Sequence, residues 1–574
     1  MPTLEESTNV EDENNGNEFD EEPPINSYLV TLPRNRHLEP DVLKAKREEL
    51  IKFKKFGAYT VVDTPKDEKV LGTSWVVTEK EKGGETVTKA RLCVRGDQEP
   101  DKHLIATDSP TVAKSNIRLM LAVASKENWM ICASDVTSAF LQSAGIKRKV
   151  FVRPPREAGV KAGQVWLLEK TVYGLLDASR GFYLNFSQSL CNLGMEISKM
   201  DPALFLYFTD GSTDKSLTRK LSGIISTHVD DSLTVGDKTF RENIVEPMMK
   251  KFMYGSHEEP PFRYVGLNIS RTKEGLFLDQ DHYVDKLCDT DFNLSQDIRL
   301  DDLLGEEDQG KFRSIAAKLG MLSLTSRPDI AFEAKVLTAK YRKATKRDFK
   351  EAVKKMKMVK GKSTRMNYPD LGELKNWVIV GFSDASVNSM PDRVGSVGGQ
   401  VILAANKKTD RACVLSWRSK QLHRVVHSSL AAEAFSLLEL FGDLKYTRLT
   451  LQQLYGKQVF DIPFIAITDS KNLWQAVHTI KNVEDKRLIN TIVELKEAMA
   501  LDKCAQELRH LPGEFMLADG LTKKGASSDE LMLVLQTGRF QLRGGWDVIN
   551  RSGFTLRDWM RTNEENFEDE DVEK

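Results

Sequence analysis

Two adjacent carboxylates, Asp230 and Asp231, stand between two apolar runs in the segment Ile224–Gly236. The apolar residues on both sides predict two short β-strands, with the acids at the turn between them. Carboxylates at the tip of an apolar hairpin are unfavourable unless water solvates them or a cation neutralises them. Mg²⁺ is held through one or two carboxylates together with substrate phosphates, so the pair suits phosphoryl transfer assisted by two metals. A polar hairpin turn without chemistry is the alternative.

A third carboxylate, Asp135, follows the apolar run Trp129–Ser134, which is predicted to form a strand and to pass into a helix. An acid at such a place often serves only as the N-cap of the helix, where it accepts hydrogen bonds from free backbone amides. Paired in space with Asp230, it would instead complete a metal site.

Three cations are separated by even numbers of residues in the run Val87–Gly96, which is predicted to return from a hairpin turn as a strand. Because side chains alternate along a strand, Lys89, Arg91 and Arg95 are expected to share one face. Cations on one face repel each other unless they meet anions. A triphosphate is one candidate anion, and a plain solvated surface is the alternative.

Four further carboxylates occur in the C-terminal part of the chain. Asp384 and Asp469 each end an apolar run that is predicted to be a strand, and Asp519 follows later. Glu433 lies on the apolar stripe of a helix expected over Ser428–Leu451, where a carboxylate needs a partner. Clustered acids repel each other, and divalent cations neutralise them while positioning a water and a leaving oxygen. For Glu433 a buried salt bridge is the alternative.

The charge of the chain is unevenly distributed. Its 574 residues carry a formal net charge of −1, but residues 1–24 alone carry −9 and residues 563–574 carry −6. The intervening residues 25–562 therefore carry +14, which suits a partner with a phosphate backbone. At about 150 residues per domain, the length predicts three or four domains.

Several classes of protein are disfavoured. The six cysteines are scattered without a C-x-x-C pair, which indicates buried thiols in a reducing compartment instead of disulfides or a zinc knuckle. The N-terminus has no basic segment followed by an apolar one, and no apolar run approaches the length of a membrane span. We therefore expect an intracellular, cytoplasmic protein without a membrane partner.

Several stretches occur in the order found in reverse transcriptases, and in detail they resemble the Pol polyproteins of copia-type long-terminal-repeat retrotransposons. The main matching segments are Lys89–Gly96, Asp135–Leu141, Tyr173–Arg180 and His228–Asp231. Further similarity lies at Tyr264–Ile269, Phe312–Ile315 and Thr325–Phe332. The C-terminal acids resemble the Asp-Glu-Asp-Asp site of ribonuclease H, so the resemblance covers roughly residues 38–540.

The resemblance implies an α+β polymerase with palm, fingers and thumb, followed by an α/β ribonuclease H-like domain with a mixed sheet. The implied divisions are a disordered acidic tail (1–24), the reverse transcriptase (38–300), a connection segment (301–372), the ribonuclease H-like domain (373–540) and a C-terminal segment with a disordered acidic tail (541–574).

The resemblance also implies roles for individual residues. The catalytic and metal-binding acids would be Asp135, Asp230 and Asp231 in the polymerase, and Asp384, Glu433, Asp469 and Asp519 in the ribonuclease H. Lys89, Arg91 and Arg95 would lie near the phosphates of the incoming nucleotide. Phe140 matches the aromatic gate that excludes a ribose 2′-hydroxyl, with ordinary core packing as its alternative.

The implied cofactor is Mg²⁺, with two ions in each active site and Mn²⁺ as a possible substitute. The implied partners are an RNA template, an RNA–DNA hybrid, deoxynucleoside triphosphates and other retroelement proteins. The implied activity is RNA-directed DNA synthesis combined with ribonuclease H cleavage.

The chain departs from the family pattern at three positions. His228 stands where the family usually has Tyr, and Leu176 and Asp177 stand where it usually has Lys and Gln. Asp177 puts a negative charge where template or nucleotide is expected. A decayed or repurposed fragment that binds nucleic acid or protein partners without polymerising is therefore the competing hypothesis.

Overall fold

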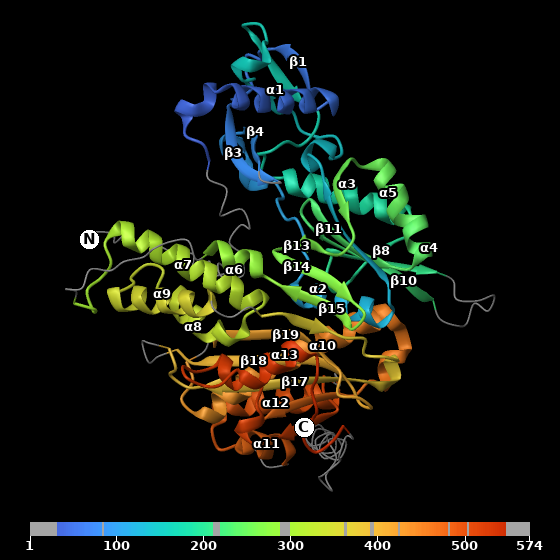
Figure 1. Ribbon diagram of the computed structural model, residues 1–574, viewed down its shortest axis with the longest axis vertical. Coiled ribbons are helices and arrows are strands. Elements are labelled where there is room, and N and C mark those ends of the chain that lie inside the picture. The colour runs from blue at the N-terminus through green and yellow to red at the C-terminus, as the bar shows by residue number, and fades with distance from the viewer. Residues whose placement is uncertain are drawn as a thin grey trace, which may run out of the picture.

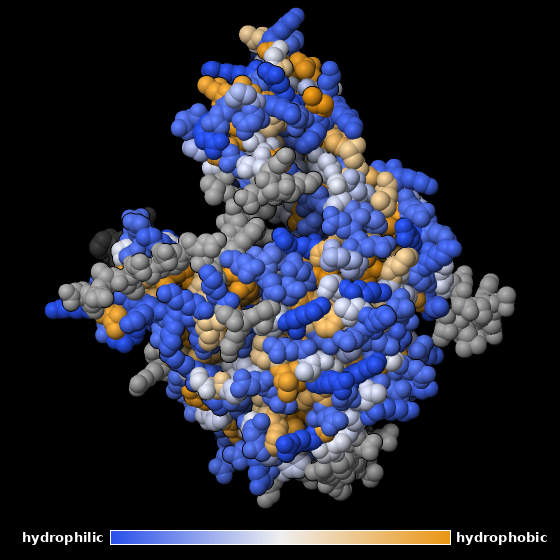
Figure 2. All heavy atoms as spheres, viewed as in Figure 1, coloured by the Kyte–Doolittle hydropathy of each residue, from blue (hydrophilic) through white to orange (hydrophobic). Residues whose placement is uncertain are grey.

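The computed structural model describes nine stretches of the chain, and both acidic tails lie outside them. The described residues are 31–82, 85–209, 219–287, 299–360, 364–390, 395–422, 425–479, 483–501 and 504–546. None of the helices in these stretches combines the length and the hydropathy that crossing a bilayer requires. The space-filling view is hollowed between the N-terminal elements and helices α6–α9, and its visible surface is mainly hydrophilic (Figure 2).

The N-terminal elements form two small sheets and a helix (Figure 1). Helix α1 (Pro40–Lys55) begins with a proline, whose fixed φ suits the first helical position, and it packs against β4 with Phe53 buried. A hairpin pairs β3 (Thr73–Lys82) with β4 (Glu85–Val94), as the sequence predicts. The second sheet has the order β1-β7-β6-β2, with strands Tyr59–Asp63, Gln164–Leu168, Phe151–Val152 and Val70–Leu71.

A six-stranded antiparallel sheet follows, in the order β12-β5-β11-β10-β9-β8. Helix α3 (Ala178–Asn192) covers one face, where Phe182, Phe205 and Phe240 share a core. Leu233 on the opposite face belongs to a different core. The strands are Tyr254–Glu258, Met130–Val136, Asp231–Gly236, Lys220–His228, Leu204–Thr209 and Glu196–Ile197.

A small sheet and a group of helices continue the chain. The sheet has the order β13-β14-β15-β16, with strands Phe262–Tyr264, Leu267–Thr272, Gly275–Asp279 and Met366–Tyr368. Helices α6, α7 and α9 share a core that includes Phe312 and Phe349. Lys350, Lys354 and Lys357 stay exposed on the other side of α9. The four helices here are α6 (Asp281–Leu287), α7 (Glu306–Thr325), α8 (Ala331–Thr338) and α9 (Lys346–Lys360).

The C-terminal sheet has five strands in the order β19-β18-β17-β20-β21. The first three strands are antiparallel, whereas β20 and β21 run parallel to β17. These strands are Ala412–Gln421, Val397–Asn406, Trp377–Ser386, Phe464–Thr468 and Glu507–His510. Helices α10 (Ser429–Tyr455), α11 (Lys471–His478) and α12 (Lys486–Ala500) pack with this sheet (Figure 1). The arrangement confirms the expected ribonuclease H-like fold with a mixed sheet.

Helix α2 (Lys114–Lys126) joins the six-stranded and five-stranded sheets, because it contacts both β11 and β19. Its Arg118 is 3% exposed, and the guanidinium lies 3.7 Å from the ring centroid of Trp417 on β19. The same guanidinium donates to the backbone oxygens of Leu324 (2.8 Å) and Thr325 (3.1 Å), in the last turn of α7. A cation is favourable at this end of a helix. Arg118 therefore ties three parts of the chain together.

The elements agree closely with the sequence predictions, and the α+β fold class is confirmed. The expected helix after Asp135 is only the short 3₁₀ helix Ala139–Gln142, preceded by Ser138 at φ +51°. That left-handed residue breaks the continuity between strand and helix, so Asp135 is not a helix N-cap. The domain boundaries proposed from the sequence stay a prediction.

Arg118→Ala is expected to lower the free energy of unfolding by about 2–4 kcal/mol, because it removes the donor to the carbonyls of Leu324 and Thr325, of which the latter is buried, and the packing on Trp417. Chemical denaturation followed by tryptophan fluorescence measures the change. Arg347→Ala removes an exposed arginine whose partner Asp301 is also exposed, and it should cost less than about 1 kcal/mol. Equal losses in the two variants would contradict the structural role of Arg118.

Candidate active sites

Backbone pairing brings Asp135 and Asp231 together in the six-stranded sheet. The two residues are direct partners in the register between β5 and β11. Directly opposite residues on antiparallel strands have their Cβ atoms about 4.5–5.5 Å apart on the same face, so the two carboxylates repel. All three polymerase candidates, with Asp230 in the adjoining turn, are half-buried. The predicted hairpin with acids at its tip is present.

The turn that carries Asp230 is strained. It joins β10 to β11 through two residues, and the first of them, Val229, has φ +59°. A β-branched residue rarely adopts this left-handed conformation, which costs on the order of 1–3 kcal/mol. The carbonyl of Asp230 accepts a hydrogen bond from the Val136 amide at 3.0 Å. The strand that contains Asp135 therefore helps to hold the turn.

Tyr173 gathers three of the candidate residues around one ring. The ring of Phe140 meets it edge-on at 4.9 Å, and the guanidinium of Arg91 lies 5.8 Å from its centroid. Burial raises the pKa of Tyr173, and the nearby charge of Asp230 adds to the rise. Arg91, Phe140 and Asp230 thus converge although they come from separate motifs. Phe140 is half-buried and packs against two cores, which fits both a gate and a core residue.

The sequence predicts that the three cations share one face of a strand, and this prediction is wrong for Arg95. Strand β4 ends at Val94, and Arg95 leaves the extended conformation at ψ 67°. Its guanidinium pairs with Asp97 at 2.7 Å. Lys89 is exposed on the strand and Arg91 is half-buried. The departure follows from the end of the strand, which no spacing pattern in the sequence marks.

Two glycines allow the segment after β4 to pack directly on the Tyr173 segment. The Val94 amide donates to the carbonyl of Tyr173 at 2.7 Å, and the Gly96 amide donates to the carbonyl of Gly174 at 3.2 Å. A Cβ atom on Gly174, whose φ is +91°, would lie 2.1 Å from the carbonyl oxygen of Val94. Only glycine fits there, so the backbone itself joins these two motifs.

The carboxylate of Asp177 has a cationic partner within the fold. Its carboxylate accepts two hydrogen bonds from Arg148, at 2.6 Å and 3.0 Å. The same guanidinium donates to Glu99 at 2.5 Å and 3.2 Å. A bidentate arginine pair of this kind is among the stronger hydrogen-bonded contacts. The departure from the family pattern at Asp177 therefore does not leave an unpaired carboxylate.

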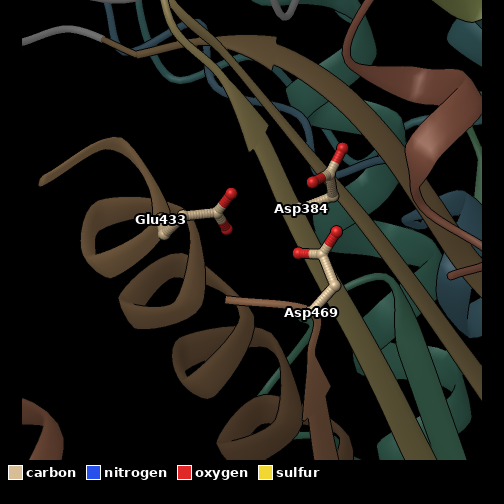
Figure 3. A group of neighbouring side chains, drawn as sticks. All are labelled: Asp384, Glu433 and Asp469. Atoms are coloured by element: carbon tan, nitrogen blue, oxygen red, sulfur yellow. The ribbon is translucent and has the colours of Figure 1, made fainter. Parts of the chain in front are cut away.

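A second cluster of acids lies near the C-terminal ends of strands β17 and β20 in the five-stranded sheet. One oxygen from each of Asp384, Glu433 and Asp469 lies within 4.8 Å of the others. The three side chains point toward one another from a strand, a helix and the loop after a strand (Figure 3). In the described part of the chain, these three acids are close enough to share one metal ion, and neither Asp519 nor the polymerase acids belong to the group.

Local structure explains why the three acids meet. Strands β17 and β20 are parallel, and Ser383 pairs with Thr468. The residue after each of them is an acid, so Asp384 and Asp469 lie side by side near the C-terminal ends of these strands. Ser428 caps α10 by accepting a hydrogen bond from the Ala431 amide. The helix therefore starts close to these strand ends and presents Glu433 within its first two turns.

Burial and mutual repulsion make these acids unusually weak. Asp384 and Glu433 are 3% and 5% exposed. Burial, followed by the charges of Asp384 and Asp469, raises the pKa of Glu433 to about 9. Burial also raises the pKa of Asp384 to about 6, with contributions from Asp469 and Asp519, and it raises the pKa of Asp469.

The predicted alternative for Glu433, a buried salt bridge, is not supported. Within the described part of the chain, its Oε2 atom is buried without a hydrogen-bond partner. A buried carboxylate oxygen without a partner costs free energy, and a divalent cation would satisfy it. The donor set of three carboxylates at short range suits a hard cation such as Mg²⁺. The residues therefore fit a metal.

Asp519 stands beside the triad but faces a different partner. Its Oδ1 atom lies 2.5 Å from the Nζ atom of Lys523, one turn later. The hydroxyl of Thr522, which is fully buried, donates to Asp384. The sequence analysis did not identify Thr522 and Lys523 as site residues. Their position three and four residues after Asp519 could have indicated that they lie near the acids. His510 contacts the backbone oxygen of Asp469 at 3.0 Å, beside the triad.

The raised pKa values predict that the metal-free protein loses stability as the pH rises. With a folded pKa of about 9, Glu433 keeps a proton that the unfolded chain releases near its ordinary value of 4.5. The folded state therefore binds more protons across this window, and the free energy of unfolding falls with pH. Above the pKa of Asp384, the slope due to Glu433 approaches about 1.4 kcal/mol per pH unit. Urea denaturation in EDTA at a series of pH values measures it.

Glu433→Gln is expected to flatten this slope, because the amide does not titrate. Glu514→Gln changes an acid outside the cluster and should leave the slope as it is. Mg²⁺ should stabilise the unchanged protein more as the pH rises, since it binds the ionised carboxylates. The same steep slope in Glu433→Gln would contradict the assignment of the titration to this residue.

Comparison with known proteins identifies the family of the first site. Residues 56–299 match the family described as "Reverse transcriptase (RNA-dependent DNA polymerase)". The Retrovirus-related Pol polyprotein from transposon RE1 of Arabidopsis thaliana is 26% identical over 401 residues, which cover 67% of this chain and 26% of that protein. The corresponding polyprotein from transposon TNT 1-94 of Nicotiana tabacum is 25% identical over 462 residues, which cover 76% of this chain and 33% of that protein. The chain thus spans a quarter to a third of these relatives.

Two solved structures are also similar to parts of the chain. The LC11-RNase H1 crystal structure in complex with RNA/DNA hybrid is 18% identical, covers 27% of this chain and 99% of its own, and has a TM-score of 0.20. The structure of the foamy viral protease-reverse transcriptase in complex with ds DNA is 10% identical and has a TM-score of 0.23. The match covers 80% of this chain and 69% of that chain. The sequence matches carry the comparison: the chain is similar to the Pol polyproteins of copia-type retrotransposons, and its residues 56–299 match the reverse transcriptase family.

Proposed function

We propose that the chain is an RNA-directed DNA polymerase with ribonuclease H activity, derived from a retrotransposon polyprotein. The observation that carries this proposal is the presence of two separate acidic constellations on two different sheets. One pairs Asp135 with Asp231 beside Asp230, and the other gathers Asp384, Glu433 and Asp469. Each combines carboxylates that repel unless cations join them.

In the polymerase site, Asp135, Asp230 and Asp231 would hold two Mg²⁺ ions, for which Mn²⁺ is the expected substitute. When bound, these ions would supply charge neutralisation and Lewis-acid activation for the attack of a primer 3′-hydroxyl on a deoxynucleoside triphosphate. Arg91 would pair with the phosphates, and its position 5.8 Å from the ring centroid of Tyr173, on which the charge of Asp230 also acts, supports this role. Lys89 and Arg95 are assigned to the same phosphates at longer reach. Exposed cations remain mobile enough to contact a ligand that arrives from solution.

In the ribonuclease H site, Asp384, Glu433, Asp469 and Asp519 would hold two Mg²⁺ ions. When bound, these ions would supply Lewis-acid activation of water and charge neutralisation for hydrolysis of the RNA strand. Glu433 and Asp384 must lose their protons when cations bind, so metal binding is linked to proton release. Thr522 keeps the Asp384 carboxylate oriented through its hydroxyl.

The proposed substrates are an RNA template, an RNA–DNA hybrid and deoxynucleoside triphosphates, and the excess positive charge of residues 25–562 favours such polyanions. Other retroelement proteins are proposed partners, and the cytoplasm is the proposed location. A repurposed fragment that binds nucleic acid without polymerising stays the second candidate, since His228 replaces the usual tyrosine. A second reason is Leu176, and the pairing of Asp177 with Arg148 makes the third departure a weaker reason.

Asp230→Asn is expected to abolish DNA synthesis on an RNA template while leaving hybrid cleavage largely intact. A neutral amide binds Mg²⁺ poorly, and the second acidic cluster lies on another sheet. Primer extension and cleavage of a labelled hybrid are measured on the same preparation. Asp302→Asn, which alters an exposed carboxylate outside both acidic groups, serves as the control. Loss of both activities from a protein that still folds by circular dichroism would contradict two independent sites.

Phe140→Ala is expected to let ribonucleotides compete with deoxyribonucleotides, because a smaller side chain leaves room for a 2′-hydroxyl. The ratio of the two incorporation efficiencies is the readout, with Phe460→Ala, at an exposed phenylalanine of the C-terminal part, as the control. If Phe140 is only a core residue, the variant loses stability by about 3 kcal/mol or more without a change in that ratio.

A further inference from the structure

A lysine ammonium is built into the acidic cluster of the ribonuclease H-like domain. Lys523 lies four residues after Asp519, and its Nζ atom is 2.5 Å from Asp519 Oδ1. The lysine side chain is 49% exposed, whereas that of Asp519 is 25% exposed. The pair therefore lies at the boundary between the buried triad and solvent.

The charge of Lys523 acts on the whole cluster. Its ammonium lowers the pKa of Asp384, Glu433 and Asp469, against the larger effect of their burial. Partial burial alone would lower the pKa of Lys523. The hydrogen bond to Asp519 and the nearby charges of Asp384 and Asp469 outweigh it, so the pKa of Lys523 is raised. The lysine thus provides part of the neutralisation that four clustered carboxylates require.

The segment that carries Lys523 is fixed by close packing. The buried Thr522 donates to Asp384, and the Ser419 hydroxyl on β19 donates to the backbone oxygen of Leu521 at 2.6 Å. A Cβ atom on Gly399 would lie 2.7 Å from Thr522 Cγ2, so strand β18 approaches the segment as closely as glycine allows. These contacts hold the backbone next to Lys523, so the ammonium is anchored beside the cluster.

We propose that Lys523 is a positioning residue that serves as the resident counter-ion of this site and holds Asp519 apart from the triad until a divalent cation displaces it. The proposal rests on the proposed function, which assigns the divalent cation. It accounts for the observation that Asp519 is outside the group formed by Asp384, Glu433 and Asp469. A metal that recruits Asp519 must break its pair with Lys523, so the lysine lowers the affinity for that metal.

The sign of the effect follows from electrostatics. Removing the ammonium leaves the carboxylates less neutralised, which destabilises the metal-free protein and makes an added cation more favourable. Lys523→Met is therefore expected to lower the Mg²⁺ dissociation constant about three- to tenfold and to lower the melting temperature in EDTA. Lys523→Arg keeps a cation that can pair with Asp519, and it should restore both values toward those of the unchanged lysine.

Calorimetric titration with Mg²⁺ tests the proposal on the full chain. Every variant carries Asp230→Asn, so that binding at the polymerase site does not add to the signal. Lys524→Met is the matched control, since the adjacent Lys524 is 73% exposed and pairs only loosely, at 3.7 Å, with Glu351. It should leave the dissociation constant unchanged. Lys523→Gln provides a second neutral variant if Lys523→Met does not fold.

A double-variant cycle separates this role from a purely structural one. In the Asp519→Asn background, Lys523→Met should change the Mg²⁺ dissociation constant much less, because the pair that it breaks is already absent. An equal change in both backgrounds, or weaker Mg²⁺ binding by Lys523→Met, overturns the proposal. If the parent protein binds Mg²⁺ and cleaves hybrid but Lys523→Met leaves the affinity unchanged, only this inference fails. If the parent neither binds Mg²⁺ nor cleaves hybrid, the proposed function fails as well.

Discussion

Repulsion between carboxylates that the backbone forces together is the constraint on which both candidate sites depend. In the six-stranded sheet the register of β5 and β11 sets Asp135 opposite Asp231. In the five-stranded sheet the parallel pairing of β17 with β20 delivers Asp384 and Asp469 to neighbouring strand ends. The hydrophobic cores fix these strands, so the acids cannot move apart to relieve the repulsion. The fold therefore stores an unfavourable arrangement that cations or protons must relieve.

The two sites relieve this repulsion differently in the absence of metal. The triad around Glu433 is deeply buried, so it keeps protons and uses the ammonium of Lys523. The acids around Asp230 are only half-buried, so water solvates them better. The difference in burial therefore makes the repulsion harder to relieve in the triad than among the acids of the six-stranded sheet.

The sequence predicts most elements, and among its candidate acids are the three that meet in the five-stranded sheet, because alternation and helical spacing mark strands and helices directly. It identified Glu433 through its place on an apolar stripe, and the structure buries that residue. It did not show that Arg95 leaves its strand or that Asp519 faces Lys523, because both depend on where a backbone segment ends and turns. Contacts between distant segments, such as Arg118 on Trp417, carry no local pattern at all.

The case of Asp177 shows why a single departure from a family pattern is weak support for loss of function. A carboxylate in place of an amide adds a charge, and the sequence alone suggests repulsion of a nucleotide. In the fold, Arg148 comes from another segment and pairs with Asp177, and the same guanidinium also pairs with Glu99, which makes four hydrogen bonds in all. In a decayed copy, a new carboxylate would not be expected to have an arginine placed to form two hydrogen bonds with it. The matched hydrogen bonds instead indicate that this part of the chain has kept a structure in which Asp177 has a cationic partner.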